Sequence, residues 1–251
     1  HDREEFEIHA FSFGPDTNDE MNLRIKAGVD HFHNVREMSH KDLAMFARSL
    51  EIDIAMDLGG YTANSRTQIF AMSVAPIQIN YIGYLGSLGS SYYDYLIADQ
   101  IMIPEMNKKY FAEKIIYLPN FQVNDSKESS PEVVLTRKDL GLPEKGFVFC
   151  CFSNTYKITP SVFDSWARIL QSVKDSVFLI YAGKKSAAKD NLLKEIVIRG
   201  IDPQRMIFGE SLPRPAYLAR YRAADLFLDT QPYNAGATAS DALRMGLPVL
   251  T

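Results

Sequence analysis

The stretch Asp229-Thr230-Gln231-Pro232-Tyr233-Asn234-Ala235-Gly236-Ala237-Thr238-Ala239-Ser240-Asp241 decides the fold class of this chain. It follows a strand-like apolar run at 226–228 and leads into a helical pattern that ends at Gly246. Its small residues let the backbone approach a ligand closely, and the free N–H groups of a new helix favour an anion such as a diphosphate. An ordinary strand-to-helix turn rich in Gly and Ala has the same composition, so the stretch alone leaves both interpretations open.

Apolar runs and amphipathic segments alternate along the chain on the N-terminal side of this stretch. Strands are expected at 6–13, 52–56, 77–82, 94–97, 115–118, 147–152, 177–181, 206–208, 226–228 and 249–250. Helices are expected at 18–27, 41–50, 66–72, 187–199, 214–221 and 238–245, and from Pro160 onward after a Thr159 cap. This alternation predicts an α/β fold of parallel sheets covered by helices on both faces.

A polar segment at 123–138 interrupts the alternation, and its Asp-Ser-Lys-Glu-Ser-Ser-Pro sequence at 125–131 is typical of a linker. We therefore expect two doubly wound, Rossmann-like domains at 1–122 and 139–251. Both ends look cut, because His1 stands just before a predicted strand and Thr251 follows one. We expect the chain to be a piece of a longer protein, with the first domain incomplete at its start and the second at its end.

Composition excludes several classes of function. The net charge is −4 and the basic residues are scattered, which argues against a nucleic-acid partner. The adjacent Cys150 and Cys151 lie in an apolar run, where buried free thiols are expected and a disulfide is not. Neither a membrane-spanning run nor a signal peptide is visible, so the expected location is the cytoplasm.

Known catalytic and metal motifs are missing from the sequence. The loops at 57–62 and 83–90 match neither the dinucleotide-binding glycine pattern nor the Walker pattern, and no Gly-x-Ser-x-Gly elbow is present. Of the five histidines, only His31 and His33 are close in sequence, and they lack a third ligand nearby. We therefore expect no zinc site, and no Asp-x-Asp motif suggests another metal.

Ligands of open parallel sheets bind beyond the carboxyl ends of the strands, which nominates the loops after 147–152, 206–208 and 226–228. Lys157 follows the first of these strands and can meet a phosphate as a point charge, although a surface lysine is usually only solvated. Asp241 falls in the first turn of its helix. Its carboxylate there either stabilises the helix start or accepts from a ribose hydroxyl.

Four ordered blocks of sequence resemble the catalytic region of the O-linked N-acetylglucosamine transferases and the related SPINDLY-type proteins. The blocks are 60–71, 75–86, 156–170 and 224–248, and they include Gly-Tyr-Thr at 60–62, Ala-Pro-Ile-Gln at 75–78 and Tyr-Lys-Ile at 156–158. The resemblance covers nearly the whole chain. It implies the GT-B fold, in which an acceptor-side domain and a nucleotide-sugar-binding domain face a cleft.

The resemblance also implies site residues. Lys157 matches the catalytic, diphosphate-binding lysine of the family. The positions that match nucleotide-sugar-binding residues are Asn154, Leu212, Arg214, Tyr217, Arg220, Gly236, Ala237, Thr238, Asp241 and Gly83. Within this set the family assigns the base to Leu212, Tyr217 and Arg220, and the ribose to Arg214 and Asp241.

The implied reaction is transfer of N-acetylglucosamine from UDP-N-acetylglucosamine to serine and threonine hydroxyls of proteins, without a metal or cofactor. GDP-fucose remains an alternative donor, since SPINDLY-type relatives use it. A nucleotide-binding module without transferase activity is a further alternative, because animal members carry His-Thr-Thr where this chain has Gly236-Ala237-Thr238. Tetratricopeptide repeats outside this chain are expected to select the acceptor proteins, and this piece alone is expected to be inactive.

Overall fold

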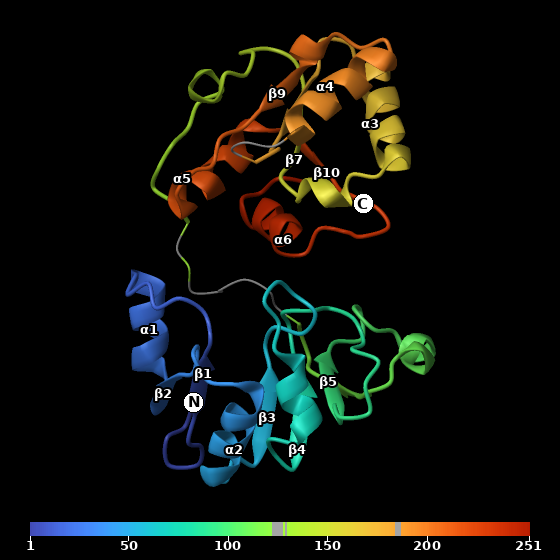
Figure 1. Ribbon diagram of the computed structural model, residues 1–251. Helices are drawn as coiled ribbons and strands as arrows, with labels where there is room; N and C mark the ends of the chain where they lie inside the picture. Colours follow the sequence, from blue (N-terminus) through green and yellow to red (C-terminus); the bar gives the residue numbers. More distant parts are fainter. Residues whose placement is uncertain (122–127, 129, 184–186) are drawn as a thin grey trace. The chain divides into compact units, whose positions relative to one another are not determined.

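The computed structural model describes residues 1–121, 128, 130–183 and 187–251 (Figure 1). The chain divides into two compact units, His1–Phe121 and Gln122–Thr251. Within the described residues, every sheet draws its strands from one unit only, and all strand pairs are parallel. The prediction of an α/β fold with parallel sheets in two halves is therefore confirmed. Residues 123–127 and 129 of the predicted linker lie outside the described part of the chain.

A five-stranded sheet organises the second unit. Its strands are β7 (Val148–Cys151), β8 (Val177–Ile180), β9 (Met206–Phe208), β10 (Leu226–Leu228) and β11 (Val249–Leu250), in the spatial order β11-β10-β7-β8-β9. The chain therefore begins in the middle of the sheet, builds outward through β8 and β9, and then crosses to the other side of β7. This reversal creates a topological switch point between β7 and β10, where ligands of such sheets bind.

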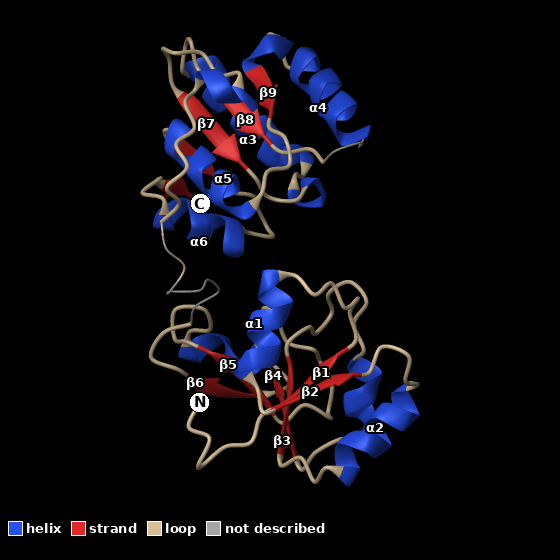
Figure 2. Cartoon of the chain, turned by 90° about the vertical axis from the view of Figure 1, so that its left-hand side faces the viewer, coloured by secondary structure: helices blue, strands red, loops and turns tan. Residues whose placement is uncertain are grey.

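Helices surround this sheet (Figure 2). They are α3 (Pro160–Ser172), α4 (Ala187–Ile198), α5 (Arg214–Ala219) and α6 (Ala237–Arg244), with short 3₁₀ turns η3 (Lys138–Leu140), η4 (Thr155–Lys157), η5 (Pro203–Arg205) and η6 (Arg220–Ala223). Helix α3 begins as predicted, because the Thr159 hydroxyl accepts from the Val162 N–H and Pro160 occupies the first position. Its buried face includes Trp166, whose ring lies 4.9 Å from that of Phe178 on β8.

The first unit has two separate parallel sheets among its described residues. The larger has the order β3 (Ile54–Asp57), β4 (Ile77–Asn80), β5 (Tyr95–Ala98), β6 (Lys114–Tyr117), and the smaller pairs β1 (His9–Ser12) with β2 (His31–Asn34). The remaining elements are α1 (Glu20–Gly28), α2 (His40–Ser49), η1 (Thr67–Met72) and η2 (Glu105–Tyr110).

Two sequence expectations for this unit are wrong. Strand β2 was not predicted, because its sequence His-Phe-His-Asn offers only one strongly apolar side chain. Strict alternation fails between β4 and β5, which are joined by residues 81–94 without a helix. Loop packing replaces a covering helix at that point.

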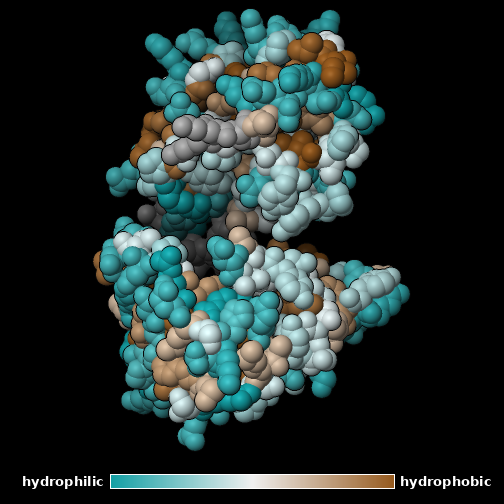
Figure 3. Space-filling view, in the orientation of Figure 1, coloured by the Kyte–Doolittle hydropathy of each residue, from teal (hydrophilic) through white to brown (hydrophobic). Residues whose placement is uncertain are grey.

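The core of the second unit includes the predicted pair of free thiols, Cys150 and Cys151, which are both fully buried. Burial raises the pKa of Cys151 to about 11. On the face shown in Figure 3, hydrophilic residues dominate the surface, with hydrophobic ones in smaller groups. Among the described residues, no helix has the length and apolar character needed to span a membrane.

Candidate functional site

A cavity of about 360 Å³ lies at the switch point of the second unit, beyond the ends of β7 and β10. It is lined by Phe152, Ser153, Asn154, Tyr156, Lys157, Tyr181, Ser211, Leu212, Tyr217, Arg220, Gly236, Ala237 and Thr238. Eight of the nominated residues are therefore brought together, namely Asn154, Lys157, Leu212, Tyr217, Arg220, Gly236, Ala237 and Thr238. Ser153 and Thr238, which are 85 residues apart in sequence, meet here because β7 and β10 are neighbours in the sheet.

Arg220 is the most unusual side chain of this cavity. It is only 3% exposed, and its guanidinium lies 3.7 Å from the ring centre of Phe152 and 4.4 Å from that of Tyr217. Its Nη1 donates to the Glu210 carbonyl at 3.2 Å, whereas its buried Nε has no hydrogen-bond partner. Burial lowers the pKa of Arg220 because it disfavours the charged form.

No carboxylate among the described residues forms an ion pair with Arg220. The two aromatic faces offset part of the cost of burying this cation, but they do not satisfy its N–H donors. A buried cation with a free donor on the wall of a cavity indicates a polar or anionic ligand there.

Two tyrosines connect this arginine to helix α6. The Tyr217 and Tyr221 hydroxyls are 2.7 Å apart, and the Tyr221 hydroxyl donates to the Thr238 carbonyl at 3.2 Å. Burial raises the pKa of Tyr217, so this hydroxyl stays protonated. The chain of hydroxyls fixes the Tyr217 ring, which is partly buried and lines the cavity. Its stacking on a base stays a prediction.

Positive charge at the other side of the cavity comes from Lys157 and the start of α6. Lys157 Nζ donates to the Asn234 carbonyl at 2.9 Å and lies 3.9 Å from the ring centre of Tyr233. Helix α6 has Gly236 as its N-cap, and no side chain caps it. The positive end of the helix dipole is therefore not neutralised by a capping group, which favours an anion.

Asp229 holds the loop before α6 and was not among the residues nominated from the sequence. Its carboxylate accepts from the Thr230 and Ala235 N–H groups, both at 2.7 Å, and from Asn234 Nδ2 at 3.0 Å. The side chain is 9% exposed. A carboxylate directly after a buried strand and before a loop of small residues is the sequence signal that could have identified it.

Arg214 and Asp241 do not line the cavity but bind each other. Arg214 donates to both Asp241 oxygens at 2.8 Å and to both Glu128 oxygens at 2.9 Å. The Asp241 carboxylate, followed by that of Glu128, raises the pKa of Arg214. Since Asp241 is 2% exposed, the Arg214 guanidinium supplies the cation that this buried carboxylate requires. The ribose contacts of the two residues stay predictions.

Gly83 belongs to the first unit, whereas all residues that line this cavity belong to the second. A Cβ at this position would come within 1.9 Å of the Leu58 carbonyl oxygen. Glycine is thus required for the close approach of the loops after β3 and β4, whatever else binds there. Its contact with a nucleotide sugar stays a prediction.

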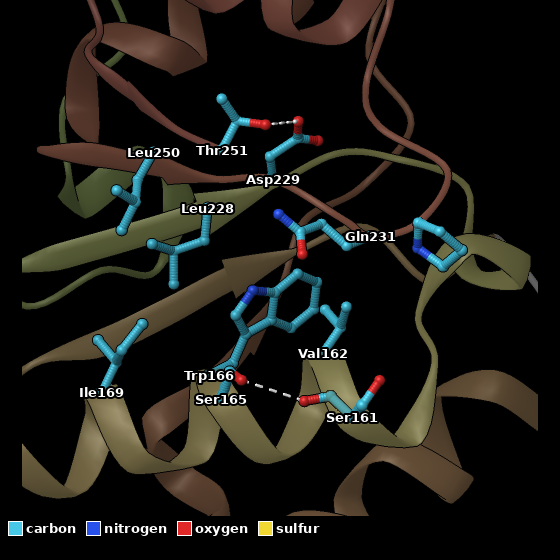
Figure 4. Close-up of a pocket in the computed structure, with 11 residues that line it drawn as sticks. Ser161, Val162, Ser165, Trp166, Ile169, Leu228, Asp229, Gln231, Leu250 and Thr251 are labelled. Atoms are coloured by element: carbon cyan, nitrogen blue, oxygen red, sulfur yellow. Dashed lines mark hydrogen bonds between the residues drawn. The ribbon is translucent and has the colours of Figure 1, made fainter.

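A larger cavity of about 500 Å³ lies between Trp166 of α3 and the ends of β10 and β11 at Leu228 and Leu250 (Figure 4). Its lining residues include no lysine, arginine or histidine, and Asp229 is its only ionisable group. A diphosphate would meet no cation there. The smaller cavity is therefore the better candidate site.

Comparison with known proteins agrees with this geometry. The family model described as glycosyl transferase family 41 matches residues 1–132 and 122–251. A probable UDP-N-acetylglucosamine–peptide N-acetylglucosaminyltransferase of Arabidopsis thaliana, SEC, is 33% identical over 257 residues, covering 100% of this chain and 26% of that protein. The SPINDLY protein of Petunia hybrida, described by the same activity, is 31% identical over 235 residues, covering 90% and 24%.

Among solved structures, a mutant of the O-GlcNAc transferase of Thermobaculum terrenum matches with a TM-score of 0.89 and 28% identity, covering 100% of this chain and 47% of that chain. This likeness over the whole chain confirms the expected GT-B fold class. The chain spans about a quarter of the length of the curated relatives it matches.

Proposed function

The chain belongs to glycosyl transferase family 41, and from this membership we propose that the protein transfers N-acetylglucosamine from UDP-N-acetylglucosamine to serine and threonine hydroxyls of proteins. The observation that carries the proposal is the cavity at the switch point. It combines a buried arginine that has an unpartnered donor, a lysine, and an uncapped helix start. These features suit a ligand with a polar base at one end and a diphosphate at the other.

The size and polarity of the cavity support nucleotide binding. Its volume of about 360 Å³ lies within the range of roughly 300–1,000 Å³ that is usual for small-molecule sites. Arg220 and Tyr217 would offer donors and an aromatic face to the base, and Leu212 lines the same cavity. The diphosphate would lie at Gly236, Ala237 and Thr238, because helix N–H groups favour anions.

In the proposed reaction the acceptor hydroxyl attacks the anomeric carbon, the bond from that carbon to the diphosphate breaks, and UDP leaves with the bonding electrons. The proton of the hydroxyl is released to water. Negative charge then grows on the departing diphosphate. Lys157 and the positive end of α6 are held in place before the reaction, so they stabilise this charge without reorganisation. We propose that no metal is needed at the donor site, because these groups supply the positive charge.

The proposal extends to partners and location. We propose that protein acceptors are selected by tetratricopeptide repeats elsewhere in the full-length protein, and that Gly83 belongs to the acceptor-side domain. A cytoplasmic location is supported by the two free cysteines, since reduced thiols are usual in reducing compartments.

The test is a transfer assay with the full-length protein, an acceptor protein and three donors in parallel: UDP-N-acetylglucosamine, GDP-fucose and buffer alone. Mass spectrometry of the acceptor and calorimetric titration with UDP and GDP are the readouts. An added N-acetylhexosamine with preferential UDP binding supports the proposal. An added fucose identifies the alternative donor, and UDP binding without transfer identifies a nucleotide-binding module. Absence of nucleotide binding to this protein refutes the proposed site.

A further inference from the structure

Three imidazoles gather on one face of the small sheet in the first unit. Strands β1 and β2 pair in parallel with His9 opposite His31 and Phe11 opposite His33. Because side chains two residues apart share a face of a strand, all three histidines lie on the same side. The ring centres of His9 and His31 are 4.4 Å apart, and those of His9 and His33 are 5.3 Å apart.

A carboxylate completes this cluster. Glu7 Oε1 lies 2.6 Å from His31 Nε2 and 3.2 Å from His9 Nε2, and these three atoms lie within 4.8 Å of one another. The expectation of no zinc site rested on sequence spacing, and His31 does have two further candidate ligands, Glu7 and His9, in a group that does not include His33. Parallel pairing of β1 with β2 brings in His9, and Glu7 just before β1, from more than 20 residues earlier, which sequence spacing could not show.

The second nitrogen of His9 is also fixed. His9 Nδ1 lies 3.0 Å from His33 Nε2, and the His33 ring packs edge-on against Phe46 of α2. This is the arrangement that orients a metal-binding histidine, since the nitrogen that does not bind the metal usually donates to a neighbouring acceptor. In the tautomer in which His9 Nδ1 donates to His33, the lone pair of His9 Nε2 can bind a metal ion beside Glu7.

We propose that Glu7, His9 and His31 form a binding site for a divalent transition metal ion, with Zn²⁺ as the ion that the donor set fits best. Two imidazole nitrogens and one carboxylate oxygen are borderline ligands that Zn²⁺ takes, with a fourth position left for water. In a tetrahedral zinc site neighbouring ligand atoms are about 3.3 Å apart. The separation of Glu7 and His9 already matches this value.

The contact between Glu7 and His31, now 2.6 Å, has to open by roughly 0.7 Å to reach that separation. Both side chains can move, because they are 66% and 48% exposed. The ion would join β1 directly to β2, which pair with no third strand among the described residues. The bound ion would thus stabilise the pairing of β1 with β2, and the site is separate from the donor cavity, which belongs to the other unit.

The experiment is Zn²⁺ titration of the metal-stripped full-length protein by calorimetry, together with Co²⁺ absorption spectra. The variant is His31→Ala, and the matched control is His40→Ala, which removes a histidine outside the cluster. We expect His31→Ala to lose one equivalent of Zn²⁺ and the intense visible Co²⁺ bands of a tetrahedral site, with His40→Ala unchanged. His33→Ala should weaken the same equivalent by about 10–100-fold, because it removes the orienting acceptor.

Glu7→Gln provides a second test in case His31→Ala misfolds, since it keeps the shape of an exposed side chain and removes the anionic ligand. Circular dichroism reports folding of each variant. Equal Zn²⁺ stoichiometry and affinity in the wild type and in either cluster variant would overturn the proposal. So would a wild type whose Co²⁺ spectrum stays that of the hydrated ion, in which case the cluster is joined by hydrogen bonds alone.

Discussion

Replacing Lys157 by alanine separates an electrostatic role in the reaction from a structural role. Its ammonium contacts the Asn234 carbonyl at 2.9 Å and the face of Tyr233 at 3.9 Å. It makes no ion pair with a carboxylate among the described residues. The native structure therefore places a cation at the cavity without neutralising it, and charge that develops on a diphosphate would be its partner.

The two contributions have different magnitudes. The exposed cation–π contact is worth about 0.5–1 kcal/mol, and the hydrogen bond about 0.5–1.5 kcal/mol. Lys157→Ala should thus lower the free energy of unfolding by about 1–2.5 kcal/mol, a minor part of the 5–15 kcal/mol that is typical of a domain. Loss of one preorganised charge-stabilising group should lower kcat by about 10²–10³-fold. The donor Kd should change less, because the charge grows in the transition state.

The assay combines kcat, the Kd of the donor and thermal unfolding in the full-length protein. Lys189→Ala is the matched control, since Lys189 Nζ also lies over an aromatic ring, 5.2 Å from the centre of Phe208, but does not line the cavity. We expect the control to lose no more than the cation–π part, about 0.5–1 kcal/mol, and to keep its turnover. Lys157→Arg should restore little of the lost turnover, because the planar guanidinium directs its N–H donors differently from an ammonium. Near-normal turnover of Lys157→Ala at saturating donor would show that this lysine is a solvated loop residue.

Three further predictions concern the second unit. Arg220→Met should weaken donor binding at least about 10-fold, the equivalent of about 1.4 kcal/mol. Its Tm should stay close to that of the wild type, because methionine removes a buried charge whose Nε has no hydrogen-bond partner. Unchanged affinity in calorimetry would contradict this prediction. Asp229→Asn should lower the free energy of unfolding in urea by about 1.5–3 kcal/mol and should lower turnover, because it loses charge-assisted hydrogen bonds to the loop before α6. Wild-type stability and wild-type turnover in this variant would exclude a positioning role for Asp229. The native pKa of Cys151, about 11, lies above its ordinary value of 9.0. The unfolded state therefore releases that proton first as pH rises, and stability should fall between pH 9 and 11, by about 1.4 kcal/mol at pH 10. Cys151→Ala should remove that part of the slope, and an unchanged slope would refute the assignment.

Local chemistry in the sequence determined most of the elements of the second unit. Strands β7 to β10 are apolar runs, and Thr159 with Pro160 sets the start of α3 by capping geometry that needs no distant partner. The small residues before α6 indicated an anion site for the same reason, since a helix start carries its dipole wherever it is placed. The adjacent cysteines were buried as expected, because an apolar run of this kind lies in the core.

Only the tertiary structure decided which of these parts meet. The neighbouring positions of β7 and β10 bring Lys157 to the loop that Asp229 holds, and β1 beside β2 brings His9 to His31. Burial of Arg220 between two rings likewise depends on what packs against η6. Each contact joins residues that are far apart in the chain, so crossover connections and packing determine it. The periodicity of a single segment records only which face is apolar, and it carries no information on the neighbour that will cover that face.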